Sequence, residues 1–165
     1  MEEVVVSGIA FDKSQAKLSV VDIPDRPGIA AKIFGGLAQL HINVDMIIQS
    51  AARDRSNDIS FTISRTDLRK AVPLLEKVRR ELGGRGVLID EKVAKVAVVG
   101  VGMRSHPGVA AKMFKALAKE KINIEMISTS EIKIACVVKE QECRRAVAAL
   151  HRAFGLAKSR SSQHR

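Results

Sequence analysis

The sequence predicts an α+β protein that contains two copies of one β-α-β-β-α-β unit. Residues 26–47 align with residues 106–127 without a gap, at a constant shift of 80, and 12 of these 22 positions are identical. Such self-similarity is typical of a repeated supersecondary unit. Each copy also alternates β-branched runs with amphipathic helical stripes. The 165 residues, 46% hydrophobic and 28% charged, suit one ordinary or two small globular domains.

The elements of the first copy follow in order along the chain. Residues 17–22 are rich in β-branched side chains and predict a strand. Pro27 then predicts a helix start, because proline at the first helical position loses no hydrogen bond. The apolar stripe of this helix is Ile29, Ile33, Leu37 and Leu40. After Asn43 we expect strands at 44–50 and 58–64, a helix at 68–82 and a last strand at 86–90.

The second copy repeats this order but lacks the last strand. We expect a strand at 95–101, a helix from Pro107 with the stripe Val109, Met113 and Leu117, strands at 124–130 and 132–139, and a helix at 141–153. The apolar run 4–9 has no partner in the first copy, so we expect it to supply the missing strand. The predicted domains are therefore residues 15–91, inserted within a domain of residues 3–14 plus 92–157, with 158–165 as a basic disordered tail.

Composition and charge exclude several classes of protein. No apolar run approaches the roughly 18 residues of a membrane helix, and the acidic start at Met1 is unlike a signal peptide, so a cytoplasmic protein without membrane contact is expected. The formal charge of +10 raises a nucleic-acid partner as an alternative, but the basic residues are not interleaved with aromatic ones.

Cys136 and Cys143 predict free thiols. No metal-ligand spacing and no catalytic constellation is present, which favours a binding protein.

The turn before the first helix of each copy is the candidate site. A helix N-terminus attracts a carboxylate or phosphate, and glycine at positions 28 and 108 lets a ligand approach the backbone. Asp25 would repel phosphate but pair with an ammonium group, and together these features describe a free amino acid. A plainer interpretation is that Asp25 and Ser105 only cap their helices.

The segments Asp25–Gln49 (DRPGIAAKIFGGLAQLHINVDMIIQ) and Ser105–Ile134 (SHPGVAAKMFKALAKEKINIEMISTSEIKI) resemble ACT domains, and more specifically the regulatory region of aspartate kinase. The resemblance covers roughly residues 3–157. It implies two ferredoxin-like domains, the first inserted in the second, in a separate regulatory subunit or a fragment of a longer chain. It also implies that the chain is no enzyme on its own and needs no cofactor, since ATP would bind the absent kinase domain.

The resemblance implies allosteric feedback in lysine, threonine and methionine biosynthesis. L-threonine, L-lysine or both would bind between ACT domains of a homodimer that associates with the catalytic kinase. The first wall of the effector site would be Asp25, Gly28, Ile29, Ala30, Asn43, Val44, Asp45 and Gln49. The second wall would be Ser105, Gly108, Val109, Ala110, Asn123, Ile124, Glu125 and Ser130. Gln49 and a short pocket favour threonine. A free-standing ACT sensor of another enzyme is the alternative.

Overall fold

The computed structural model describes residues 5–51, 54–103 and 106–156. The chain divides into two compact units. The first unit is Ser14–Lys92, and the second combines the segment up to Lys13 with the segment from Val93 onward. In order, the strands and α-helices are β1 (Val5–Pro24), α1 (Ile29–Gln39), β2 (Val44–Ala51), β3 (Ser56–Ser64), α2 (Leu68–Leu82), β4 (Gly86–Val101), α3 (Pro107–Lys119), β5 (Met126–Thr129), β6 (Lys133–Lys139) and α4 (Cys143–Ala153).

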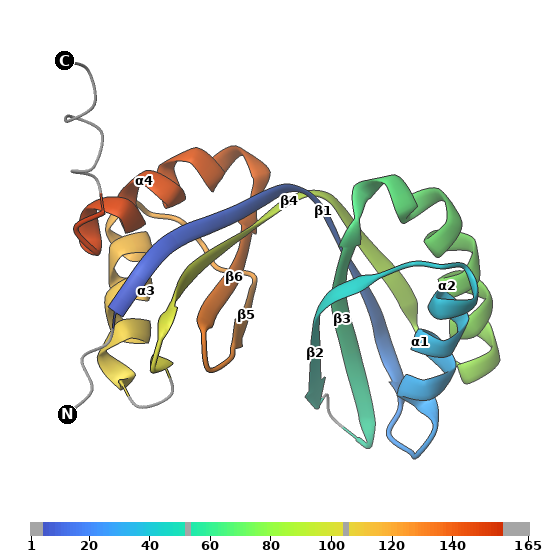
Figure 1. Cartoon of the computed structure of the whole chain (residues 1–165). Helices are drawn as coiled ribbons and strands as arrows, with labels where there is room; N and C mark the ends of the chain where they lie inside the picture. Colours follow the sequence, from blue (N-terminus) through green and yellow to red (C-terminus); the bar gives the residue numbers. More distant parts are fainter. Residues whose placement is uncertain (1–4, 52–53, 104–105, 157–165) are drawn as a thin grey trace. The chain divides into compact units, whose positions relative to one another are not determined.

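Two long strands, β1 and β4, contribute to both units (Figure 1). The sequence predicts each of them as two shorter strands, but the residues between these runs are also extended. Since β1 passes from the second unit into the first and β4 passes back, the two strands are antiparallel. The strand order is β2-β3-β1-β4 in the first unit and β1-β4-β6-β5 in the second. The start of β1 belongs to the second unit, where Ser7 Oγ donates a hydrogen bond to the Val99 carbonyl.

Each unit is ferredoxin-like, with two helices on one face of its sheet (Figure 1). The predicted stripe residues Ile33 and Leu37 of α1 are fully buried, as are Met113 and Leu117 of α3. Burying one such side chain contributes about 1.5–3 kcal/mol. Both cores are mainly aliphatic, as the scarcity of aromatic residues predicts.

Several element boundaries differ from the prediction by one to three residues, and two of these differences concern the predicted site residues. Helix α1 begins at Ile29 rather than at Pro27, whereas α3 does begin at Pro107. Strand β5 is shorter than the predicted 124–130. Its far end is a tight turn, because Ser130 Oγ accepts hydrogen bonds from the backbone N–H groups of Ile132 and Lys133.

Candidate functional site

A small pocket lies at the turn between β1 and α1 in the first unit. Its volume is about 200 Å³. The end of β1, the following turn and the first turn of α1 form one side, and β2 and β3 form the other. The lining residues are Ile23, Pro24, Asp25, Arg26, Pro27, Gly28, Ile29, Ala30, Ala31, Gln49, Asn57 and Ile59. Five predicted residues of the first wall, Asp25, Gly28, Ile29, Ala30 and Gln49, therefore meet in one cavity.

Asp25 is held at the pocket by two hydrogen bonds. Its Oδ1 accepts a hydrogen bond from Asn57 Nδ2 at 2.9 Å, and its backbone N–H donates to the Arg55 carbonyl at 3.0 Å. Its interpretation as a helix cap is wrong, because Gly28 is the N-cap of α1 and no side-chain hydrogen bond caps that helix. The carboxylate is exposed and fixed in place, so it can receive a cationic group of a ligand.

Gly28 gives the pocket its access to the backbone. Its φ of 94° lies in the left-handed region, and a Cβ placed there would meet no atom within 4 Å. Its carbonyl accepts the hydrogen bond of Lys32 N–H at 3.0 Å. The first N–H groups of a helix have no intrahelical acceptor, and Ile29, Ala30 and Ala31 line the cavity. The turn can therefore bind an anionic group close to the Asp25 carboxylate.

The other predicted residues of the first wall lie elsewhere. Val44 and Asp45 open strand β2, directly after Asn43, whereas Gln49 lies near the far end of that strand. Asn43, Val44 and Asp45 do not line the pocket, as far as the described residues show. Asn43 and Asp45 are exposed, and Val44 packs against the core of the first unit.

Asn57 was not predicted from the sequence. It is buried on β3, with 6% of its surface exposed, and pairs with Ala51 on β2 and with Ile23 on β1. The aligned repeat ends at Ile47, so repeat comparison carries no signal for β3. Gln49 pairs with Ile59 on β3, and Asn57 lies two residues before Ile59. A correct register of β2 against β3 is therefore the one signal that could have indicated Asn57.

The second copy presents a different arrangement at the matching turn. Ser105 lies outside the described residues. His106 is the N-cap of α3, and its Nδ1 lies 2.9 Å from the Gly102 carbonyl oxygen. Gly108 and Ala110 fall within the first turn of α3, where Val109 is buried.

The remaining residues of the predicted second wall lie around β5. Asn123 is exposed and Ile124 packs against the core of the second unit. Glu125 Oε1 forms an ion pair with Lys139 Nζ at 2.9 Å, so this carboxylate already has a cationic partner. Ser130 belongs to the turn after β5.

Three further observations limit the chemistry of the described residues. Cys136 and Cys143 are free thiols, as predicted, and burial raises the pKa of Cys136 to about 12, so this thiol is no nucleophile near neutral pH. Within the described ranges, no cluster of three or more His, Cys, Asp or Glu side chains is placed to hold a metal ion. None of the helices described is both long and apolar enough to cross a bilayer.

Family models identify the class of the protein. ACT-domain models match residues 18–83, in the first unit, and residues 96–154, in the second. The chain is therefore a tandem ACT-domain protein, as its sequence resemblance implied.

Similar proteins narrow this class to one family. Over 156 residues the chain is 53% identical to an aspartate kinase of Pseudomonas putida, covering 94% of this chain but 38% of that protein. It is 42% identical to the ligand-free regulatory subunit of aspartate kinase from Thermus thermophilus, covering 90% of this chain and 98% of that one with a TM-score of 0.85. A structure of aspartokinase alpha and beta subunits also matches, with 46% identity, a TM-score of 0.85 and coverage of 92% and 99%. The chain belongs to the family of aspartate kinase regulatory regions.

Proposed function

We propose that this chain senses an amino-acid end product and transmits feedback inhibition to an aspartate kinase. The observation that carries the proposal is the pocket of about 200 Å³ in which Asp25 and the start of α1 lie together. Asp25 offers a carboxylate for an ammonium group, and the adjacent first turn of α1 offers backbone N–H groups for a carboxylate. A free α-amino acid carries both of these groups.

The size and lining of the pocket favour L-threonine as the effector. A cavity of about 200 Å³ is smaller than the roughly 300–1,000 Å³ of a drug-sized site. The Gln49 amide can donate and accept hydrogen bonds, which suits a short hydroxylated side chain. L-lysine is the second candidate effector. Its longer side chain would have to extend out of this pocket, past Gln49.

A second copy of the chain would complete the site. The first wall is in the first unit, and we infer that the matching wall comes from the second unit of a partner in a homodimer. Inhibition then requires that the effector bind the paired state more tightly than the open one. A coupling free energy of about 1–3 kcal/mol would change affinity about 5- to 150-fold. The associated catalytic part of the kinase would respond to this pairing.

Calorimetric titration with L-threonine and L-lysine, with the oligomeric state followed in parallel, tests the proposal. We expect L-threonine to bind and to favour the dimer. Asp25→Asn removes the charge but keeps an oxygen that can accept the Asn57 hydrogen bond, so it separates ligand binding from folding. A hydrogen bond to a charged group contributes about 1.5–3 kcal/mol, so binding should weaken about 10- to 150-fold.

Two further variants control this experiment. Glu91→Gln removes one negative charge from an exposed position of β4 and should bind L-threonine like the unmodified chain. Asn57→Ala releases the Asp25 carboxylate without removing it and should cause a smaller loss than Asp25→Asn. Unchanged affinity in Asp25→Asn would contradict the ammonium contact. Failure of both amino acids to bind or to alter pairing would contradict the sensing function.

A further inference from the structure

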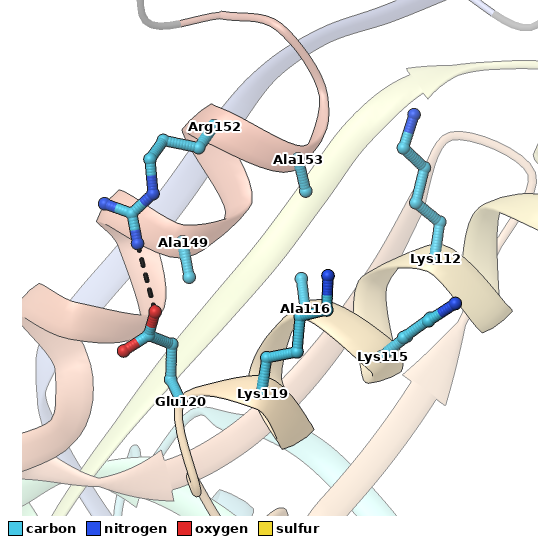
Figure 2. Close-up of a pocket in the computed structure, with 8 residues that line it drawn as sticks. All are labelled: Lys112, Lys115, Ala116, Lys119, Glu120, Ala149, Arg152 and Ala153. Atoms are coloured by element: carbon cyan, nitrogen blue, oxygen red, sulfur yellow. Dashed lines mark hydrogen bonds and ion pairs between the residues drawn. The ribbon is translucent and has the colours of Figure 1, made fainter.

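A basic groove lies between α3 and α4 in the second unit, separate from the Asp25 pocket. Its volume is about 330 Å³. Lys112, Lys115 and Lys119 project from α3, and Arg152 projects from α4 (Figure 2). The helix surfaces between them carry alanines, including Ala116, so the groove combines a small-residue lining with a cationic rim.

The charges of this groove are largely uncompensated. Glu120 provides its one carboxylate, and Glu120 Oε1 accepts a hydrogen bond from Arg152 Nη2 at 3.2 Å. Four cationic side chains against one carboxylate leave a net charge of +3. Lys115 and Lys119 form no ion pair with any carboxylate in the part of the chain that the structure describes. Lys112 Nζ lies 5.2 Å from the centroid of the Phe154 ring, a cation–π contact.

The first copy of the repeat acts as an internal comparison. Gly35 and Gln39 stand where the second copy has Lys115 and Lys119. The matching Lys32 is paired with Glu81 at 2.6 Å. At Gly36, the counterpart of Ala116, a Cβ would lie only 3.1 Å from the Leu74 side chain, so leucine fills this place. The basic groove is therefore a property of the second copy and not of the repeated fold.

The spacing of the lysines indicates the shape of the ligand. Lys112 and Lys119 are seven residues apart on α3, which corresponds to about 10 Å along the helix axis. A single carboxylate or phosphate cannot reach all of these ammonium groups, whereas an elongated anion with several charges can. Lysine binds phosphate as a compact point charge. The alanines offer no side-chain donor or acceptor to read a nucleobase, and the volume suits a small molecule.

We propose that this groove binds an oligophosphate chain, either free or as the phosphate part of a nucleotide. Calorimetric titration of the full chain with inorganic tripolyphosphate and with ATP, both without Mg²⁺ and at low salt, tests this site. We expect both to bind. Equal affinity would assign recognition to the phosphates alone, and tighter binding of ATP would show that the alanine surface accepts the nucleoside.

Paired variants separate the groove from the general positive charge of the chain. Lys115→Gln with Lys119→Gln should weaken binding of both anions about tenfold or more. Lys77→Gln with Arg80→Gln removes the same charge from exposed positions of α2 and should leave binding unchanged. Equal losses in the two double variants would overturn the proposal, because charge alone would then explain the binding.

Glu120→Gln tests the same site through a gain of affinity, which unfolding cannot cause. It removes the carboxylate that competes with the ligand and releases Arg152, so tripolyphosphate should bind about threefold more tightly. Unchanged or weaker binding would contradict the position of the site. A heptaglutamate peptide that binds more tightly than tripolyphosphate would also overturn the proposal, in favour of an acidic protein partner.

Discussion

The two copies of the repeat share a Pro-Gly pair but use it in different conformations. In the first copy Pro27 lies in a turn, Gly28 has a φ of 94°, and α1 begins one residue later. In the second copy Pro107 is the first residue of α3 and Gly108 is already helical. Identical residues at a helix start therefore do not produce identical sites.

The difference shows which residues serve the fold and which serve the site. The shared stripes bury the same helical face in both units, so their conservation between copies reflects packing. The pocket instead depends on Asp25 and Asn57, which the second copy does not repeat in its described residues. A ligand site in one copy gives no assurance of a site in the other.

The cores of the two copies also differ at their centres. Phe61 on β3 pairs with Ile47, and Cys136 on β6 pairs with Ile127, the repeat equivalent of Ile47. Phe61 and Cys136 therefore hold matching places. Phe61 is fully buried and packs edge-on against Phe34, with ring centroids 5.3 Å apart. The first copy has a large aromatic side chain where the second has a small thiol.

The largest expected effect is on the free energy of unfolding when these two residues are truncated. Phe61→Ala should cost about 3–5 kcal/mol, because it removes a large buried ring and leaves a cavity. Cys136→Ala should cost about 1 kcal/mol. Calorimetric melting of both variants measures the difference. Equal losses would contradict this prediction, because the two cores would then depend on these side chains to the same extent.

A smaller effect is expected when valine replaces each glycine of the Pro-Gly pairs. Gly28→Val places a β-branched residue in the left-handed region and should cost about 1–2 kcal/mol of stability, and it should also block the pocket. Gly108→Val lies in helical backbone with no atom within 4 Å of its Cβ, so its stability should be unchanged or slightly higher. Melting temperatures and L-threonine titrations of both variants test the contrast. Unchanged L-threonine binding in Gly28→Val would contradict the proposed pose.

Much of the fold could be predicted from the sequence because local patterns specify it. The stripe of α1 and the bounds of α2 follow from helical periodicity, and α2 spans Leu68–Leu82 as predicted. The continuity of β1 could not be predicted, because the polar residues between its apolar runs resemble a loop. The Arg65 side chain donates hydrogen bonds to the carbonyl of Gln15 on β1 and to the carbonyl of Glu91 on β4. These contacts join segments that are far apart in the sequence, so no local pattern predicts them.

The candidate site could be predicted only in part, for a similar reason. Asp25 and Gly28 are close in sequence and carry a helix-start pattern. Asn57 reaches the pocket through the register of β3 against β1 and β2, which depends on pairing between distant segments. Gln49 lines the pocket and Asp45 does not, because they lie near opposite ends of β2. Composition does not reveal which end of the strand reaches the pocket.

The thiol of Cys136 also gives the second copy a pH dependence that Phe61 cannot give the first. Burial raises the pKa of Cys136 from an ordinary value of 9.0 to about 12. Above pH 9 the unfolded chain loses this proton while the folded chain retains it. The unfolded state then binds fewer protons, so the free energy of unfolding falls as pH rises. This contribution is fully present below pH 9 and is lost progressively toward pH 12.

The smallest predicted effect is therefore a difference in slope between pH 9 and 11. One such thiol lowers the free energy of unfolding by at most about 1.4 kcal/mol per pH unit. Cys136→Ala lacks the group and should lose stability less steeply, although it is less stable at pH 7. Urea denaturation of both proteins at several pH values measures the two slopes, with lysine ionisation common to both. If the free energy of unfolding falls with the same slope in both proteins, the Cys136 thiol ionises in the folded protein as readily as in the unfolded chain. The centre of the second core would then admit water, whereas the centre of the first core excludes it.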